Sequence, residues 1–420
     1  MIRTIARYGA RHVPGTTGIL IKTLQAGRAV QGPSIAEFER SFAAYHGMRH
    51  AVAASCGRMA FYYILKALNL PPQSEILFPA LTFWVVPEIA RINELKPAFV
   101  DVDPDTYNMD PTALAAAVTP QTRAVVPTHL YGQPCQMDAI MEIARKHQLL
   151  VIEDCAHAIG AAYQGQKTGT FGDASFFSFQ TLKGLNTYGG GITVTNDGAW
   201  AQRIRELVEA EPWPSASQVI KRLWGGYLQR AFISPYGFTL SMFLAFYIAS
   251  FFGDYDLTRF IWEKIRPLEP LPESYRRRYS NAQAVIGLKM LENIDALNQK
   301  SRVHADRLTE GLKDINAILP PRTIPGAFPV YYQYCIRVSD PATLRHRAIR
   351  RGVDVEIMHV DICTRLELFA PYSSRCPGAE STEGCLQLPV YSGLRPEDVE
   401  RILRVVREAS RDLPPVARPG

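Results

Sequence analysis

Two features of this chain carry most of its chemical information: a lysine in apolar surroundings and an acidic strand end. Lys183 follows Ser178-Phe-Gln-Thr-Leu, and Asp154 closes the earlier run Leu150-Val-Ile-Glu. A lysine held among apolar residues can lose its proton near neutral pH and attack an aldehyde. A carboxylate behind a hydrophobic strand can keep a pyridine nitrogen protonated. Together they predict pyridoxal phosphate as cofactor, whereas a lone lysine of this kind more often reaches the surface.

Three further segments could complete a site for this cofactor. Gly57 lies where an apolar strand gives way to a helix, and a helix N-terminus with a glycine can bind phosphate closely. His157, three residues after Asp154, could donate to the phenolic oxygen of the cofactor, although Asp154 itself would equally suit a helix cap. Phe83 and Trp84 follow another strand, and the alternation of side chains lets only one of these rings face the site.

The composition excludes several classes of protein. With 420 residues, 47% of them hydrophobic, and a net charge of +6, the chain is expected to form a large and a smaller domain. It contains no dense Lys/Arg run with interleaved aromatics, so a small anionic ligand or an anionic surface is expected rather than nucleic acid. The seven cysteines are scattered and never form a C-x-x-C pair, which predicts neither disulfides nor a metal site. A cytoplasmic location is expected, since Met1–Pro14 lacks the apolar core of a secretory signal.

Seven β-rich apolar runs alternate with helical patterns in the first half of the chain. They begin at residues 51, 75, 97, 123, 149, 174 and 191. This alternation predicts a three-layer α/β sandwich with a mostly parallel sheet, whose ligands bind at the carboxyl ends of the strands. A long amphipathic helix is expected from Ser280 to Leu312, and the alternating signals from Tyr331 to Val406 predict a small α+β domain.

Two segments do not fit an ordinary catalytic fold. Arg3, Arg7 and Arg11 make the amino-terminal arm cationic, which is typical of a solvated arm or of a helix resting on anionic lipid. Residues 231–253 carry no charge and are long enough to span a membrane. A span would separate the two halves of a continuous catalytic fold, so we expect instead a hydrophobic hairpin. It would lie at a subunit interface or dip into one leaflet.

Several motifs at matching spacing resemble the DegT/StrS family of pyridoxal-phosphate sugar aminotransferases. They are Gly32-Pro-Ser-Ile-Ala-Glu-Phe-Glu39, Phe99-Val-Asp-Val-Asp-Pro-Asp-Thr106, His129-Leu-Tyr-Gly-Gln-Pro134, Ile152-Glu-Asp-Cys-Ala-His157, Phe171-Gly-Asp-Ala-Ser-Phe-Phe-Ser-Phe179 with Lys183, and Gly189-Gly-Gly191. The resemblance covers roughly residues 16–208 and 273–408. It implies the type I aspartate-aminotransferase fold, a homodimer with sites completed across the dimer, and action on keto sugars carried by nucleotides.

The resemblance also assigns roles to individual residues. It implies that Lys183 attaches the cofactor and shuttles protons, that Asp154 holds the ring nitrogen, and that His157 contacts the phenolic oxygen. Phosphate would be bound by Ser178 and by the backbone amides of Gly57, Arg58 and Met59, and Phe83 would stack on the ring. Glutamate is the implied amino donor, and the amino sugar would serve surface polysaccharide, lipopolysaccharide or glycosylated metabolites. A sugar dehydratase of the same fold and a cofactor-binding regulatory protein are the alternatives; Lys183 speaks against the first, because some such dehydratases have histidine there.

The sequence departs from the family pattern at three places. Arg58 stands where threonine is usual, and Arg276 stands where an asparagine usually reaches the phosphate of a neighbouring subunit. The connection from about residue 211 to 269 is longer and more apolar than usual. The expected organisation is a cationic arm (1–31), a large cofactor-binding domain (32–208), an apolar insertion (209–272), a connecting long helix (273–318), a small domain (319–408) and a disordered tail (409–420).

Overall fold

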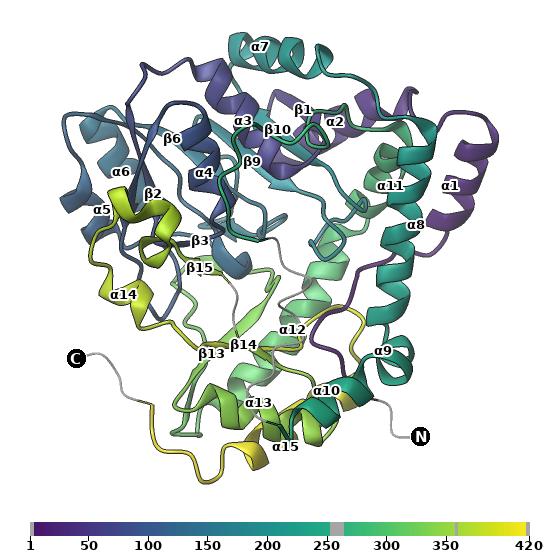
Figure 1. Cartoon of the computed structure of the whole chain (residues 1–420), viewed down its shortest axis with the longest axis vertical. Coiled ribbons are helices and arrows are strands. Elements are labelled where there is room, and N and C mark those ends of the chain that lie inside the picture. The colour runs from purple at the N-terminus through teal and green to yellow at the C-terminus, as the bar shows by residue number, and fades with distance from the viewer. Residues whose placement is uncertain (1–3, 253–263, 358–359, 417–420) are drawn as a thin grey trace.

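A sheet of seven strands forms the centre of the computed structural model, which describes residues 4–252, 264–357 and 360–416 (Figure 1). The strand order is β1 (His50–Ala54), β10 (Gly191–Thr195), β9 (Ala174–Ser178), β6 (Leu150–Asp154), β5 (Thr122–Val125), β2 (Glu75–Pro79) and β4 (Lys96–Val100). Neighbouring strands from β9 to β4 are parallel, whereas β10 is antiparallel to both of its neighbours. The predicted strands and the mostly parallel sheet are therefore confirmed.

Helices cover both faces of this sheet, because successive strand residues point to opposite sides. Ile76 and Phe78 of β2 pack in one core, and Leu77 between them packs in another. The first face is covered by α3 (Gly57–Leu68), α4 (Val85–Ile92) and α7 (Gly198–Glu209). The opposite face is covered by α5 (Pro111–Ala117), α6 (Met137–His147), α2 (Ser34–His46) and α11 (Asn281–Leu291). This is the predicted three-layer α/β sandwich.

A second sheet forms the centre of a small α+β unit. Its order is β11 (Ile318–Leu319), β13 (Tyr334–Val338), β16 (Leu386–Leu388) and β14 (Glu356–Ile357). Its core includes Leu308, Tyr334 and Ile402. The helices packed against this sheet are α12 (Ile294–Leu312), α13 (Pro341–Arg350) and α15 (Pro396–Ala409). Outside the two main sheets, the chain also forms the short strands β3 (Leu81–Thr82), β15 (Asp361–Ile362), β7 (Ala162–Tyr163), β8 (Gln166–Lys167) and β12 (Ala327–Phe328) and the short helix α14 (Pro377–Glu380). The domain boundaries expected from the sequence stay a prediction.

The expected single helix from Ser280 to Leu312 is two helices. Helix α11 ends at Leu291, and Asn293 leaves helical geometry (φ −115°, ψ 1°) before α12 begins at Ile294. The break lies where the chain passes from one core to another: Ile286 of α11 packs with the large sheet, and Leu308 of α12 packs with the small one. Amphipathic periodicity in the sequence does not reveal that the two halves of the segment pack in different cores.

The amino-terminal arm is packed into the protein, which corrects the expectation of a solvated or lipid-facing arm. Ile5 forms a bridge with Val353 of the small unit, and only then does α1 (Thr16–Gln25) begin. Arg7 is 5% exposed and makes ion pairs with Asp354 (2.7 Å) and Glu356 (2.9 Å). Two carboxylates of the small unit thus neutralise the charge of Arg7, and Arg11 is buried as well; Arg3 lies outside the described residues.

The uncharged segment 231–253 contains the end of one helix and two short ones. Helix α8 (Ala216–Ile233) ends at Ser234, whose side chain caps α9 (Pro235–Ser241), and α10 (Phe243–Ala249) follows. Phe238 of α9 packs on Ala6 and Ile349, so α9 and α10 lie beside α13 at the small-domain end (Figure 1). Among the helices of the described residues, none combines the length and apolarity needed to cross a membrane.

The carboxyl-terminal tail is ordered further than expected. Leu413 packs at the edge of the small core, and the Val416 amide donates to the Asn316 carbonyl oxygen at 2.9 Å. These contacts correct the predicted disordered tail as far as Val416; residues 417–420 lie outside the described part of the chain.

Candidate active site

The predicted site residues gather at one edge of the large sheet. Strand β1 is antiparallel to β10, which is antiparallel to β9, so the carboxyl ends of β1, β2, β6 and β9 share that edge. Asp154 ends β6 and Ser178 ends β9, while Gly57 begins the helix after β1. Phe83 follows β3, the short strand after β2. Ligands of parallel sheets bind at this edge, as expected.

The first turn of α3 forms a cradle suited to an anion. Cys56 precedes the helix with extended backbone (φ −165°, ψ 167°) and provides no side-chain cap for it. Helix N-termini with this arrangement present backbone N–H groups and a positive dipole end. A Cβ on Gly57 would lie 2.9 Å from the Ser178 Cβ, so only glycine brings the two segments this close. The cradle therefore fits a phosphate, with Arg58 and Met59 next in the turn.

Arg58 adds a positive charge beside this cradle. Its Nη1 donates to the Tyr275 hydroxyl at 2.6 Å, and its guanidinium lies 4.7 Å from the Tyr275 ring centroid and 5.8 Å from that of Phe83. Phe83 is 37% exposed, whereas Trp84 is buried in the core. Of the two adjacent rings, that of Phe83 lies at the edge of the site and that of Trp84 lies in the core, as the alternation of side chains required.

Lys183 lies in the electrostatic environment that the chemistry needs. Burial lowers its pKa to about 7, against the opposing effect of Asp154. Burial likewise raises the pKa of Asp154 to about 6, while the Ala156 amide, which donates to its Oδ1 at 2.9 Å, and Lys183 oppose this rise. Burial and the charge of Lys183 keep the pKa of His157 well below its usual value. Near neutral pH, Lys183 is therefore partly present as a free amine.

Tyr332 of the small unit reaches this group, and the sequence analysis missed it. Its ring centroid lies 4.5 Å from the Lys183 Nζ and 4.3 Å from the His157 ring centroid. The Nδ1 of His157 accepts a hydrogen bond from the Tyr131 amide at 3.3 Å. The aromatic run before β13 was a visible signal, but no spacing in the sequence links it to Lys183.

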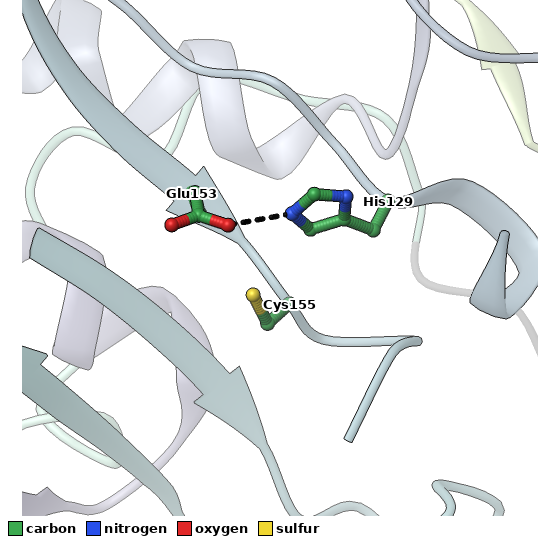
Figure 2. Close-up of side chains that lie close together, drawn as sticks. All are labelled: His129, Glu153 and Cys155. Atoms are coloured by element: carbon green, nitrogen blue, oxygen red, sulfur yellow. Dashed lines mark hydrogen bonds and ion pairs between the residues drawn. The ribbon is translucent and has the colours of Figure 1, made fainter. Parts of the chain in front are cut away.

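Behind Asp154, a buried cluster of His129, Glu153 and Cys155 has metal-ligating side chains (Figure 2). The His129 Nε2 is hydrogen-bonded to Glu153 at 2.9 Å, and its Nδ1 accepts from the Cys135 amide at 3.0 Å. Glu153 also accepts from three backbone amides, those of Gly169, Phe171 and Gly172. Burial raises the pKa of the Cys155 thiol to about 12. These engaged atoms hold the end of β6 in place and leave His129 and Glu153 poorly suited to bind a metal.

Arg276, which stands where the family usually has asparagine, is engaged within its own chain. Its Nε lies 3.1 Å from an oxygen of Glu211, whose side chain is buried. The rest of the Arg276 side chain is largely exposed.

Comparison with known families matches residues 16–220 and 253–407 to the DegT/DnrJ/EryC1/StrS aminotransferase family. The chain belongs to this family. It is a pyridoxal-phosphate-dependent aminotransferase of fold type I, as the resemblance implied. The unmatched gap, residues 221–252, coincides with most of α8 and with α9 and α10. The family likeness therefore covers the site and leaves these helices unexplained.

Individual relatives and solved structures agree with this assignment. The chain is 31% identical to a GDP-perosamine synthase from Caulobacter vibrioides over 89% of each chain. It is 30% identical to a UDP-N-acetyl-3-dehydro-alpha-D-glucosamine 3-aminotransferase from Acidithiobacillus ferrooxidans, over 88% of this chain and 86% of the relative. DesV from S. venezuelae, solved with a ketimine intermediate, superposes with a TM-score of 0.75 at 27% identity and 95% coverage of each chain.

Proposed function

We propose that the enzyme transfers an amino group from glutamate to the keto group of a nucleotide-linked or lipid-linked sugar. The product would be an amino sugar for surface polysaccharide, lipopolysaccharide or glycosylated metabolites. The observation that carries this proposal is Lys183, with a lowered pKa, beside Asp154 and His157 in a chain of a sugar aminotransferase family. Relatives named for sugar substrates support the substrate class.

Each residue has a defined part in this proposal. When bound, pyridoxal phosphate supplies an electron sink that stabilises negative charge at the carbon next to the amine. Lys183 would hold the cofactor, and its amine would move a proton to and from that carbon. Asp154 would keep a proton at the ring nitrogen, and His157 would contact the phenolic oxygen. Ser178 and the amides of Gly57, Arg58 and Met59 would bind the phosphate, and Phe83 would lie against the ring.

The test follows both halves of the reaction in purified protein loaded with pyridoxal phosphate. Adding glutamate should change the visible absorbance and release 2-oxoglutarate in the wild type but not in Lys183→Ala. Keto sugars linked to UDP, GDP or dTDP should then gain the isotope-labelled nitrogen of glutamate, detected by mass spectrometry. Glutamine is the matched alternative donor. Loss of water from the sugar without nitrogen gain would favour the dehydratase, and no response to any donor would favour the regulatory protein.

A homodimer in the cytoplasm is part of the same proposal. Among the described residues, Ile19 and Ile21 of α1 are large apolar side chains exposed by more than 40% in the single chain. Exposed apolar side chains of this kind support a second copy of the chain as partner, in line with the homodimer that the family resemblance implies. Light scattering should give twice the chain mass of 46.9 kDa, and a monomeric mass with full activity would overturn the proposal.

We further propose that α8, α9 and α10 dock on an anionic membrane surface. Nine large apolar residues recur at four-residue spacing along them, each 41 to 82% exposed: Ile220, Trp224, Leu228, Phe232, Tyr236, Leu240, Leu244, Ile248 and Phe252. We call this set the apolar ridge. Exposed apolar side chains in this number, with aromatic residues among them, are typical of helices lying in the membrane interface.

The charge around the apolar ridge favours lipid as its partner. Residues 212–253 contain no aspartate or glutamate but include Lys221, Arg222 and Arg230. Beside α10, helix α13 contributes Arg350, whose guanidinium lies 4.1 Å from the Phe251 ring centroid and donates to the Ser250 hydroxyl at 3.1 Å. Basic side chains next to an apolar row complement anionic head groups.

Vesicle flotation tests this docking. Wild-type enzyme should float with vesicles containing anionic phosphatidylglycerol and less with purely neutral vesicles. Leu240→Glu combined with Leu244→Glu should abolish flotation, while Val303→Glu, at an exposed apolar position on α12, should leave it unchanged. Equal flotation of all three proteins would overturn the proposal. A fall in oligomer mass with the ridge variant would instead make the apolar ridge a subunit contact.

A further inference from the structure

Helix α8 packs against the loop that carries Lys183, although most of this helix lies outside the family match. Residues 179–189 connect β9 to β10 without forming a helix or strand, so contacts from other elements must hold the loop in place. Leu185 of the loop is fully buried, in the same core as Leu223 of α8. Tyr188 belongs to that core as well, and its ring centroid lies 4.9 Å from that of Tyr227 of α8. The helix therefore supports the loop within a few residues of Lys183.

Gly226 of α8 forms a notch for the Tyr188 ring. A Cβ on Gly226 would overlap this ring and lie 2.7 Å from the Tyr188 Cβ, so only glycine lets the helix and the ring come this close. A Cβ on the preceding Gly225 would meet no atom of another element within 4 Å among the described residues. Glycine is unfavourable inside a helix. The contact with Tyr188 gives a reason for Gly226 that Gly225 lacks.

Tyr188 has a left-handed backbone, which is uncommon for residues other than glycine. Its φ is 58°, and such a conformation persists only where the surrounding structure holds it. Arg230 of α8 donates a hydrogen bond to the Tyr188 hydroxyl, and its Nη1 lies 2.9 Å from the Nδ1 of His12 in the amino-terminal arm. From α11, the Gln283 Nε2 donates to the Gly189 carbonyl oxygen at 2.8 Å. The loop is thus held between α8 and α11.

We propose that α8 positions Lys183 by holding the Tyr188 ring against Gly226. The inference rests on the proposed role of Lys183 and does not depend on which sugar is the substrate. Residues 185–188 are all 6% exposed or less, and closely packed interiors transmit displacements. A shift of the Tyr188 ring is therefore passed along the buried loop to the backbone of Lys183. The helices outside the family match are in this way part of the catalytic unit.

The position of the loop sets how far the Lys183 amine is removed from water. Asp154, His157 and Tyr332 surround this amine, and burial lowers its pKa to about 7. A displaced loop would let water reach the amine, so its pKa would rise toward the ordinary lysine value while the three surrounding side chains stay the same. If α8 only stabilised the fold, changing it would lower stability and leave this pKa where it is.

The experiment compares Gly226→Ala with Gly225→Ala. Both changes add one methyl group to α8 and bring the same gain in helix propensity, so the contact with Tyr188 is the difference between them. Cofactor uptake by cofactor-free enzyme gives the pH midpoint set by Lys183. The absorbance change with glutamate gives the maximal rate and the half-saturating concentration. Thermal unfolding reports structural damage.

Gly226→Ala should raise the pH midpoint of cofactor uptake and lower the maximal rate about 10- to 100-fold, because displacing a reacting group by about 1 Å can cost about 100-fold. The half-saturating glutamate concentration should change much less. Gly225→Ala should match the wild type in all three quantities. Equal results for the two alanine variants would overturn the proposal, as would a less stable Gly226→Ala protein with an unchanged midpoint.

Substitutions of Tyr188 test the same contact from the side of the loop and leave α8 intact. Tyr188→Ala removes the ring and should raise the midpoint and lower the rate as Gly226→Ala does. Tyr188→Phe keeps the ring and should recover most of that loss. Equal losses in the alanine and phenylalanine variants would overturn the proposal, because the packed ring would then have no part in the effect.

Lys183→Ala separates this inference from the proposed function. If Lys183→Ala takes up the cofactor with the visible absorbance of the wild type, the proposed role of Lys183 is wrong and the inference falls with it. If Lys183→Ala loses that absorbance while Gly226→Ala keeps the wild-type midpoint, the inference alone is wrong. The uptake measurement needs no amino donor, so it decides the part played by α8 even if glutamate is not the natural donor.

Discussion

The strands that carry the site and the helices that carry the apolar ridge are both rich in apolar residues, yet they use them in opposite ways. In β2, β9 and β10 every residue is buried, whereas in α10 none of the described residues is. The strand residues are covered by helices on two faces, whereas the ridge residues stay 41 to 82% exposed in the single chain. Apolar composition alone therefore says little about location; the surrounding elements decide whether such residues form a core or a contact surface.

The largest expected effect concerns the site carried by the buried strands. Lys183→Ala should lower kcat at least about 10²- to 10⁴-fold, the range for losing a positioned acid–base group. The fold should persist, because Lys183 lies in a loop rather than in a strand. Steady-state kinetics and circular dichroism measure the two quantities. Substantial turnover in this variant would show that another group moves the proton.

Phe78→Ala should be the most damaging change to the sheet itself. Phe78 is fully buried in β2, and truncating such a ring typically costs about 3–5 kcal/mol of unfolding free energy. Urea denaturation followed by circular dichroism measures this cost. A loss below about 1 kcal/mol would mean that the large core repacks around the gap, contrary to ordinary behaviour.

The pKa of Lys183 measures how strongly burial at the edge of the sheet disfavours the charged amine. Its folded pKa of about 7 lies below the usual lysine value, so the free amine fraction rises as pH rises through 7. Between that pH and the ordinary lysine pKa, the unfolded chain binds more protons, so stability of the cofactor-free protein should increase with pH there. Cofactor uptake by cofactor-free enzyme should show a midpoint near 7. Asp154→Asn should lower that midpoint, because Asp154 raises the lysine pKa; a midpoint above 9 would contradict the desolvation.

The smallest expected effect lies on the apolar ridge. Leu240→Ser and Leu244→Ser should each change unfolding free energy by no more than about 0.5 kcal/mol, because both side chains are mostly exposed. Each should nevertheless weaken vesicle binding. The comparison would fail if either serine variant destabilised the soluble enzyme as much as Phe78→Ala, since the ridge would then belong to a core.

Prediction from sequence succeeded where local pattern and burial coincide. The seven strands, the position of Asp154 at a strand end and the start of a helix at Gly57 all follow from short segments with strong periodicity or turn chemistry. It failed where distant contacts decide. The burial of Arg7 depends on Asp354, the break before α12 depends on two separate cores, and Tyr332 reaches Lys183 only through the packing of the small unit. Spacing along one chain carries no record of those partners.

The exposure of Trp224 on the apolar ridge gives the enzyme a built-in optical reporter. Its indole is 66% exposed, whereas that of Trp84 is buried beside the site. Indole emission shifts to shorter wavelength when water around the ring is replaced by hydrocarbon. If α8 docks on a membrane as proposed, Trp224 would report the loss of surrounding water by this shift, and Trp224→Phe would leave the emission of the other four tryptophans as the reference.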